Sequence, residues 1–112
     1  MATPGVDGVT PGVDGATPQF DELIHPSTRL SIVSLLAAAD WIEFSFIRDQ
    51  LELSDSALSK QLSTLEEAGY VNLEHTVGER RRRVRARLSP RGRSAFDGHI
   101  AALRAIVGGP LT

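Results

Sequence analysis

Cysteine is absent from this 112-residue sequence, which excludes disulfide bonds and thiolate-ligated metal sites. Aromatic residues make up only 5% of the chain. No apolar run reaches the roughly 18 residues that a membrane-spanning helix needs. The opening residues, MATPGVDG, lack the basic and apolar stretches of a secretory signal. We therefore expect a soluble cytoplasmic protein built as one small domain.

Recognisable catalytic motifs are also missing. No serine, histidine and acid are spaced for nucleophile activation, and there is no glycine-rich phosphate loop. His25, His75 and His99 are far apart in the sequence and lack a ligand pattern at helical spacing. We expect no enzymatic activity, no metal site and no cofactor.

Positive charge is scarce overall but concentrated in one segment. The net charge is −2, and residues 1–67 hold three basic side chains against eleven acidic ones. Residues 80–93, in contrast, contain eight arginines and no acid. A local basic field of this kind attracts a polyanion more effectively than the overall charge suggests.

The N-terminal region contains a short repeat, TPGVDG, that recurs within residues 3–18. Frequent proline and glycine with little apolar surface predict a disordered tail over residues 1–19. A partner-binding arm is the alternative, but this segment has no aromatic anchor or basic cluster. The folded domain is expected over residues 20–109, followed by a second tail over 110–112.

The first helix is expected to start at Pro26 and Ser27 and to continue through residues 29–39. Its apolar residues cover more than one face, so it must be buried on more than one side, by the domain core and by a second subunit. A short alternating strand follows over residues 41–44.

Two short helices joined by a tight turn come next. Ser45 is expected to cap a helix over residues 46–51, with Phe46 and Ile47 turned inward. A third helix begins after Ser54 and ends near Gly69, which provides a left-handed stop. Its core side carries Leu58, Leu62 and Leu65. This arrangement is a helix-turn-helix unit.

The hydrophobic period then changes from helical to two, which predicts a β-hairpin closed by a loop over residues 76–80. Apolar residues on its second strand alternate with Arg83, Arg85 and Arg87. Ser89 and Pro90 begin a last helix that runs to about Val107. The order helix, strand, helix, helix, hairpin, helix is mainly α with a small antiparallel β-hairpin (α+β).

Four segments resemble MarR- and ArsR-like winged-helix regulators. Residues 58–71 are similar to the recognition-helix segment, and residues 88–96 to the junction of wing and last helix. Residues 25–30 and 39–44 resemble a compact subfamily of stand-alone regulators. The resemblance covers residues 20–107 and implies a winged helix-turn-helix domain that binds DNA to regulate transcription.

The resemblance implies that the third helix lies in the major groove, where serine and lysine contact base edges or phosphates. Asp55 is expected to support the helix dipole rather than to contact a base. The candidate recognition residues are Ser54, Asp55, Ser56, Ser59, Lys60 and Ser63.

The hairpin is the second expected DNA contact, because adjacent arginines with only Glu79 beside them repel one another without an anionic partner. Arginine binds phosphates and enters a narrow minor groove. The candidate wing residues are Arg80, Arg81, Arg82, Arg83 and Arg85.

The last helix is apolar over a wide face, which suggests pairing across a two-fold axis. We expect the protein to be a homodimer that binds a palindromic site and reads two half-sites about one DNA turn apart. A dimer on promoter DNA acts most often as a repressor, and we expect that role here. Its predicted interface comprises Leu30, Val33, Phe96, His99, Ile100, Leu103, Ile106 and Val107.

Two other functions fit the same fold. A protein-interaction module would use the last helix and the tail and treat the arginines as solubilising. RNA binding through the hairpin is the third alternative, although no surface aromatic residue is evident for base stacking. Some MarR-like proteins bind small molecules, and the sequence identifies no effector.

Overall fold

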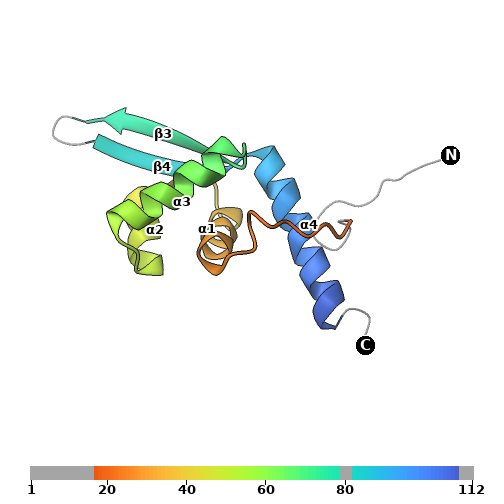
Figure 1. Ribbon diagram of the computed structural model, residues 1–112. Helices are drawn as coiled ribbons and strands as arrows, with labels where there is room; N and C mark the ends of the chain where they lie inside the picture. The colour runs from red at the N-terminus through yellow and green to blue at the C-terminus, as the bar shows by residue number, and fades with distance from the viewer. Residues whose placement is uncertain (1–16, 79–81, 109–112) are drawn as a thin grey trace.

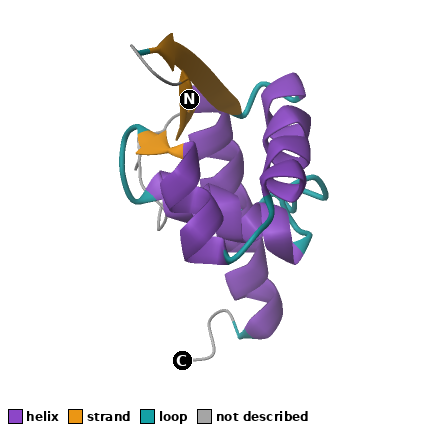
Figure 2. Ribbon diagram, turned by 90° about the vertical axis from the view of Figure 1, so that its left-hand side faces the viewer, coloured by secondary structure: helices purple, strands orange, loops and turns teal. Residues whose placement is uncertain are grey.

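The computed structural model describes residues 17–78 and 82–108, in which the elements follow the predicted order (Figure 1). The helices gather beneath a three-stranded antiparallel sheet of order β2-β4-β3, as the turned view also shows (Figure 2). The elements are α1 Ser27–Ala37, β2 Ile42–Glu43, α2 Phe44–Leu51, α3 Asp55–Glu67, β3 Val71–Val77, β4 Arg82–Leu88 and α4 Pro90–Val107. Most of the predicted N-terminal tail, residues 1–16, lies outside the described residues, as do residues 109–112.

Helix α1 lies at the centre of the domain. Its first residue follows Pro26, and Ile32, Val33 and Leu36 are fully buried in the core. The helix ends at Ala37, two residues earlier than predicted. The Arg93 guanidinium donates to the carbonyl of Ala37 at 3.3 Å, so a side chain of α4 satisfies a free carbonyl at this end.

Helix α2 begins earlier than the sequence suggested. Strand β2 has only two residues, so α2 starts at Phe44 with Glu43 at its N-cap, and the prediction that Ser45 caps it was wrong. Ile47 is fully buried, as expected, whereas Phe46 is 52% exposed, which corrects the inward assignment of Phe46. With the helix in this register, Phe44 and Leu51 share the inner face with Ile47 because they are three and four residues away from it.

The turn between α2 and α3 contains a non-glycine residue in the left-handed region. Glu52 has φ 55° and ψ 47°, and the next amide, of Leu53, donates to the carbonyl of Arg48 at 2.9 Å. This conformation reverses the chain tightly enough to bring the two helices together. A side chain with a Cβ is unfavourable here.

We expect Glu52→Gly to raise the free energy of unfolding by up to about 1 kcal/mol, because glycine adopts this conformation without the Cβ clash. The matched control is Lys60→Gly in the middle of α3, which should lower it by about 1 kcal/mol through lost helix propensity. Urea denaturation of the three proteins measures both changes. Equal destabilisation by the two substitutions would contradict the assigned strain.

Helix α3 agrees closely with the prediction. Ser54 Oγ accepts a hydrogen bond from the amide of Ala57 at 3.0 Å, which confirms it as the N-cap. The leucines predicted for the core are buried, and Gly69, with φ 82°, follows the end of the helix as the left-handed residue.

The hairpin strands are longer than predicted, since β3 continues to Val77 and β4 starts at Arg82. Strand β4 is central and pairs with both neighbours: Arg85 is opposite Glu74 on β3 and Glu43 on β2. Val71, Ala86 and Leu88 are buried on the core face. The odd-numbered arginines of β4 therefore occupy the opposite face.

Helix α4 is joined tightly to the end of α3. Ser89 Oγ accepts from the amide of Gly92 at 2.9 Å, which confirms the predicted cap, and donates to the carbonyl of Gly69 at 2.6 Å. The amide of Ser89 also donates to the carbonyl of Tyr70 at 3.0 Å. A Cβ on Gly92 would lie 2.1 Å from that carbonyl oxygen, so only glycine fits at this position.

The second half of α4 extends past the core (Figure 1). Ile106 and Val107 are 71% and 75% exposed, although both are large apolar side chains. Exposed apolar surface at the end of a long helix is typical of an interface with another chain. Among the described residues, no helix has the length and apolar character that crossing a bilayer requires.

Candidate nucleic-acid interface

The exposed face of α3 carries every residue that was predicted to recognise DNA. The side chains of Ser54, Asp55, Ser56, Ser59, Lys60 and Ser63 are all exposed, while the buried leucines occupy the other side of the helix. Ser54 is engaged as the cap, and its Oγ lies 3.4 Å from Ser56 Oγ. The remaining serines on this face are small, so they leave the surface of α3 open to a groove of DNA.

Asp55 is held in an ion pair that the sequence analysis did not identify. Its carboxylate accepts from Arg48 Nη1 at 2.9 Å, and Arg48 Nε donates to Asp49 at the same distance. The hydrogen bond that Arg48 donates to Asp49 contributes most to raising the pKa of Arg48, followed by the one it donates to Asp55. These contacts favour the structural role for Asp55 over base recognition.

An open cleft of about 360 Å³ connects α3 with the sheet. Ser59 and Asp55 line it from α3, and Arg83 lines it from β4. The remaining lining comes from Glu43, Phe44, Ser45 and Val84. The structure therefore brings the candidate helix and the candidate wing together on one surface.

Of the candidate wing arginines, Arg80 and Arg81 lie outside the described residues, and Arg82 is described only through its place in β4. Arg83 is 61% exposed, with Glu43 at 3.9 Å. Arg85 Nε donates to Glu74 Oε1. The expectation that only Glu79 would accompany these arginines was wrong, because strand pairing brings in acids from β2 and β3.

Trp41 packs against two arginines on the same face of the sheet. The guanidinium carbons of Arg85 and Arg87 each lie 4.5 Å from its ring centroid, a cation–π geometry. Arg87 also contacts Asp40 at 3.4 Å. Arg85 is thus shared between a carboxylate and an aromatic ring, which makes it less available for DNA than Arg83.

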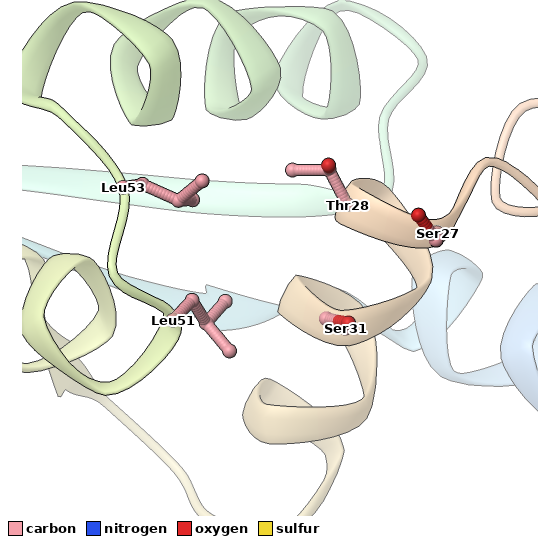
Figure 3. A pocket seen from close by; sticks show the side chains of 5 residues that line it. All are labelled: Ser27, Thr28, Ser31, Leu51 and Leu53. Atoms are coloured by element: carbon pink, nitrogen blue, oxygen red, sulfur yellow. The ribbon is translucent and has the colours of Figure 1, made fainter.

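A small depression lies between α1 and the turn before α3 (Figure 3). It is lined by Ser27, Thr28 and Ser31 from α1 and by Leu51 and Leu53, with a volume of about 130 Å³. This is below the roughly 300 Å³ at which pockets begin to enclose a drug-sized ligand. It gives no support to an effector site.

The predicted dimer residues divide into two groups. Leu30, Phe96, Ile100 and Leu103 are partly exposed, and Ile106 and Val107 are largely exposed. Val33 and His99 have no exposed surface in the single chain. The prediction that these two residues lie in the subunit interface is therefore corrected. Val33 of α1 packs in the core of the domain, and His99 is covered by the chain that precedes α1.

The family model described as a winged helix DNA-binding domain matches residues 28–107. An uncharacterised protein of Methanocaldococcus jannaschii is 29% identical over 79 residues, which cover 70% of this chain and 86% of that protein. The structure of a transcriptional regulator homologue from Pyrococcus horikoshii OT3 superposes with a TM-score of 0.73 at 24% identity, over 80% of this chain and 88% of the other.

Two longer proteins share the fold. A MarR-family regulator from Silicibacter pomeroyi has a TM-score of 0.56 at 23% identity, over 79% of this chain and 61% of its own. Streptococcus pneumoniae FabT in complex with DNA has a TM-score of 0.53 at 21% identity, over 76% and 63%. These likenesses confirm the predicted fold, mainly helical with a β-hairpin wing. On the strength of the family match, the chain belongs to the winged helix DNA-binding domain family.

Proposed function

We propose that this protein is a sequence-specific DNA-binding transcriptional regulator in which α3 enters the major groove. The observation that carries the proposal is the exposed face of α3, which presents Ser56, Ser59, Lys60 and Ser63 beside the arginine strand β4. The acid at its start, Asp55, is held in an ion pair with Arg48. A small, polar and acid-poor helix face suits contacts with base edges.

The hairpin supplies phosphate contacts in this proposal. Arg83 extends the surface of α3 through the shared cleft, and the wing arginines nearer the tip continue along the DNA backbone or into the minor groove. Phosphate contacts set affinity and register, whereas α3 sets sequence preference. FabT, one of the structural neighbours, was solved in complex with DNA.

The protein acts as a homodimer on a palindromic site and represses by occupying promoter DNA. The exposed end of α4 supports pairing, since Ile106 and Val107 would be covered by a second copy. Two subunits related by a two-fold axis place their α3 helices about 34–36 Å apart, one DNA turn.

We expect the Ile106→Glu/Val107→Glu variant to be a 12.1 kDa monomer where the wild type is a dimer, because two charges would be buried at the pairing surface. Light scattering after size-exclusion chromatography, at micromolar concentration, measures the mass. The matched control is Phe46→Glu/Val77→Glu, which replaces two other exposed apolar residues and should stay dimeric. A wild type that is already monomeric refutes dimerisation through α4.

Fluorescence anisotropy with DNA from upstream of its own gene, and with random duplex, tests the proposal at several salt concentrations. With ~4 phosphate contacts per subunit, the log–log salt slope of the dimer is expected near −7. Arg83→Ala should reduce the slope by about 1 per subunit and weaken binding to both duplexes alike. Absence of binding even at low salt overturns the proposal in favour of a protein-interaction module.

A further inference from the structure

The segment before α1, residues 19–25, is attached to α4. The amide of Gln19 donates to the carbonyl of Gly98 at 2.9 Å, which ties a residue assigned to the tail into the domain. The amide of Asp21 donates to Nδ1 of His99 at 3.0 Å. His99 has no exposed surface, and this second bond is partly buried.

The same segment contacts Tyr70 directly and α3 indirectly, through Arg29 of α1. Asp21 Oδ2 accepts from the hydroxyl of Tyr70, just past the end of α3, at 2.6 Å. Arg29 donates to the carbonyl of Leu23 at 2.6 Å and to Gln61 Oε1, on α3, at 2.8 Å. Asp21 Oδ1 also accepts from the amides of Leu23 and Ile24, which fixes the shape of the segment. Residues 19–25 therefore link His99 to Tyr70 directly and to the candidate recognition helix through Arg29.

The hydrogen bonds define the protonation state of His99. Since Nδ1 accepts from Asp21, the neutral ring carries its hydrogen on Nε2, which faces Nδ1 of His25 at 3.4 Å. Phe20 packs on both rings, with centroid distances of 4.8 Å. In this tautomer Nε2 has no free lone pair, so the two rings do not form a metal site.

A proton on His99 Nδ1 is incompatible with this arrangement. It would face the amide hydrogen of Asp21 and place a buried charge beside His25. Burial is the largest factor that lowers the pKa of His99 from its ordinary value of 6.5, and His25 lowers it further, while the Asp21 carboxylate opposes both. Asp21 also faces the Tyr70 hydroxyl, and this hydrogen bond is the largest factor that raises the pKa of Tyr70, while the charge of Arg91 lowers it.

We propose that His99 and His25 form an acid-sensitive latch: protonation breaks the bond to Asp21, releases residues 19–25 from α4 and loosens α3, so that DNA binding weakens. The inference rests on the proposed DNA binding. Its sign follows from linkage, since a histidine that must stay neutral stabilises the fold above pH 6.5 and loses that contribution as the pH falls below it.

Ordinary electrostatics predicts the opposite pH dependence of DNA binding, so the two explanations give opposite results. Acidification makes a protein more positive and should strengthen its binding to a polyanion. Weaker binding in acid therefore requires a structural change.

The experiment measures DNA affinity by anisotropy at about pH 8 and about pH 5.5, at constant ionic strength, on either side of the histidine range. We expect wild type to bind at least about 5-fold more weakly in acid, the lower end of the coupling usually found between two sites. His99→Asn keeps an acceptor at the Nδ1 position without titrating, so its affinity should stay within about 3-fold over the same range. The matched control, His75→Asn on β3, should retain the full acid effect. Wild-type binding that is equal or tighter in acid overturns the latch.

The exposed His25 offers a variant that preserves the core. His25→Asn removes the second charge and should reduce the acid effect even if His99→Asn fails to fold. An undiminished acid effect in His25→Asn contradicts the paired mechanism.

A second readout does not involve DNA. Hydrogen exchange of the Asp21 amide, followed by NMR in the free protein, should accelerate in acid relative to amides inside α3. If the protein binds no DNA at either pH, the proposed function fails, and Asp21 exchange alone decides the latch. If it binds DNA at about pH 8 and the Asp21 amide stays protected in acid, only the latch fails.

Discussion

Replacement of Gly92 by alanine is expected to lower the free energy of unfolding by about 3 kcal/mol or more, since overpacking against a fixed backbone leaves no room for relaxation. The added Cβ would lie 2.1 Å from the carbonyl oxygen of Tyr70. That carbonyl is itself bonded to the amide of Ser89, so it is not free to move. Against a typical total of roughly 5–15 kcal/mol, this loss is a large fraction of the stability. Thermal and urea denaturation measure the loss.

Gly98→Ala is the matched control in the same helix. Its Cβ would approach Gln19 Cβ at 3.2 Å and the carbonyl oxygen of Thr17 at 3.3 Å, contacts that small shifts near the chain end relieve. Both substitutions gain similar helix propensity, so the difference between them isolates the clash. Equal stability of the two variants would show that the joint between α3 and α4 is more adaptable than its hydrogen bonds imply.

The Ser56→Glu/Ser63→Glu variant is expected to lose at least about 100-fold in affinity for specific DNA, because it removes two contacts worth about 1–3 kcal/mol each and adds negative charge in the groove. Both serines are exposed, and they lie on the same face of α3 because they are seven residues, about two helical turns, apart. Anisotropy with the upstream duplex measures the loss.

The matched control, Ser34→Glu/Ser94→Glu, has the same net charge but places it on α1 and α4. It should bind within about 3-fold of wild type, since a solvated charge beyond the Debye length of about 8 Å is screened. A comparable loss in both variants would assign the effect to overall charge and remove α3 from the interface. Circular dichroism checks that both variants keep their helices.

Local rules were sufficient to predict most of the fold. The caps Ser54 and Ser89 and the left-handed Gly69 are set by residues within a few positions of each other, and all three were identified from sequence. The spacing of the leucines in α3 likewise fixed which face is buried, and hence which face is exposed. The prediction that Phe46 points inward was wrong because strand β2 has only two residues. Helix α2 therefore starts earlier, and a different set of its side chains faces the core.

The parts of the site that sequence could not predict depend on contacts between distant residues. Arg85 meets Glu74 through strand register, and Arg48 meets Asp55 across a turn. His25 and His99 are 74 positions apart, and their proximity depends on how residues 19–25 fold onto α4. A repeated spacing reveals a helix face, but it gives no indication of which side chain from elsewhere lies against it.

The chain contains a single tryptophan, and Trp41 lies against Arg85 and Arg87 on the face of the sheet beside the proposed wing. Its indole emission comes from one environment, so the wavelength and intensity need no deconvolution. When a phosphate binds near these guanidinium groups, the local field on the indole changes and the emission shifts. Excitation at the red edge of indole absorption, where DNA bases are transparent, makes the native protein its own optical probe of wing engagement, without a dye or an introduced residue.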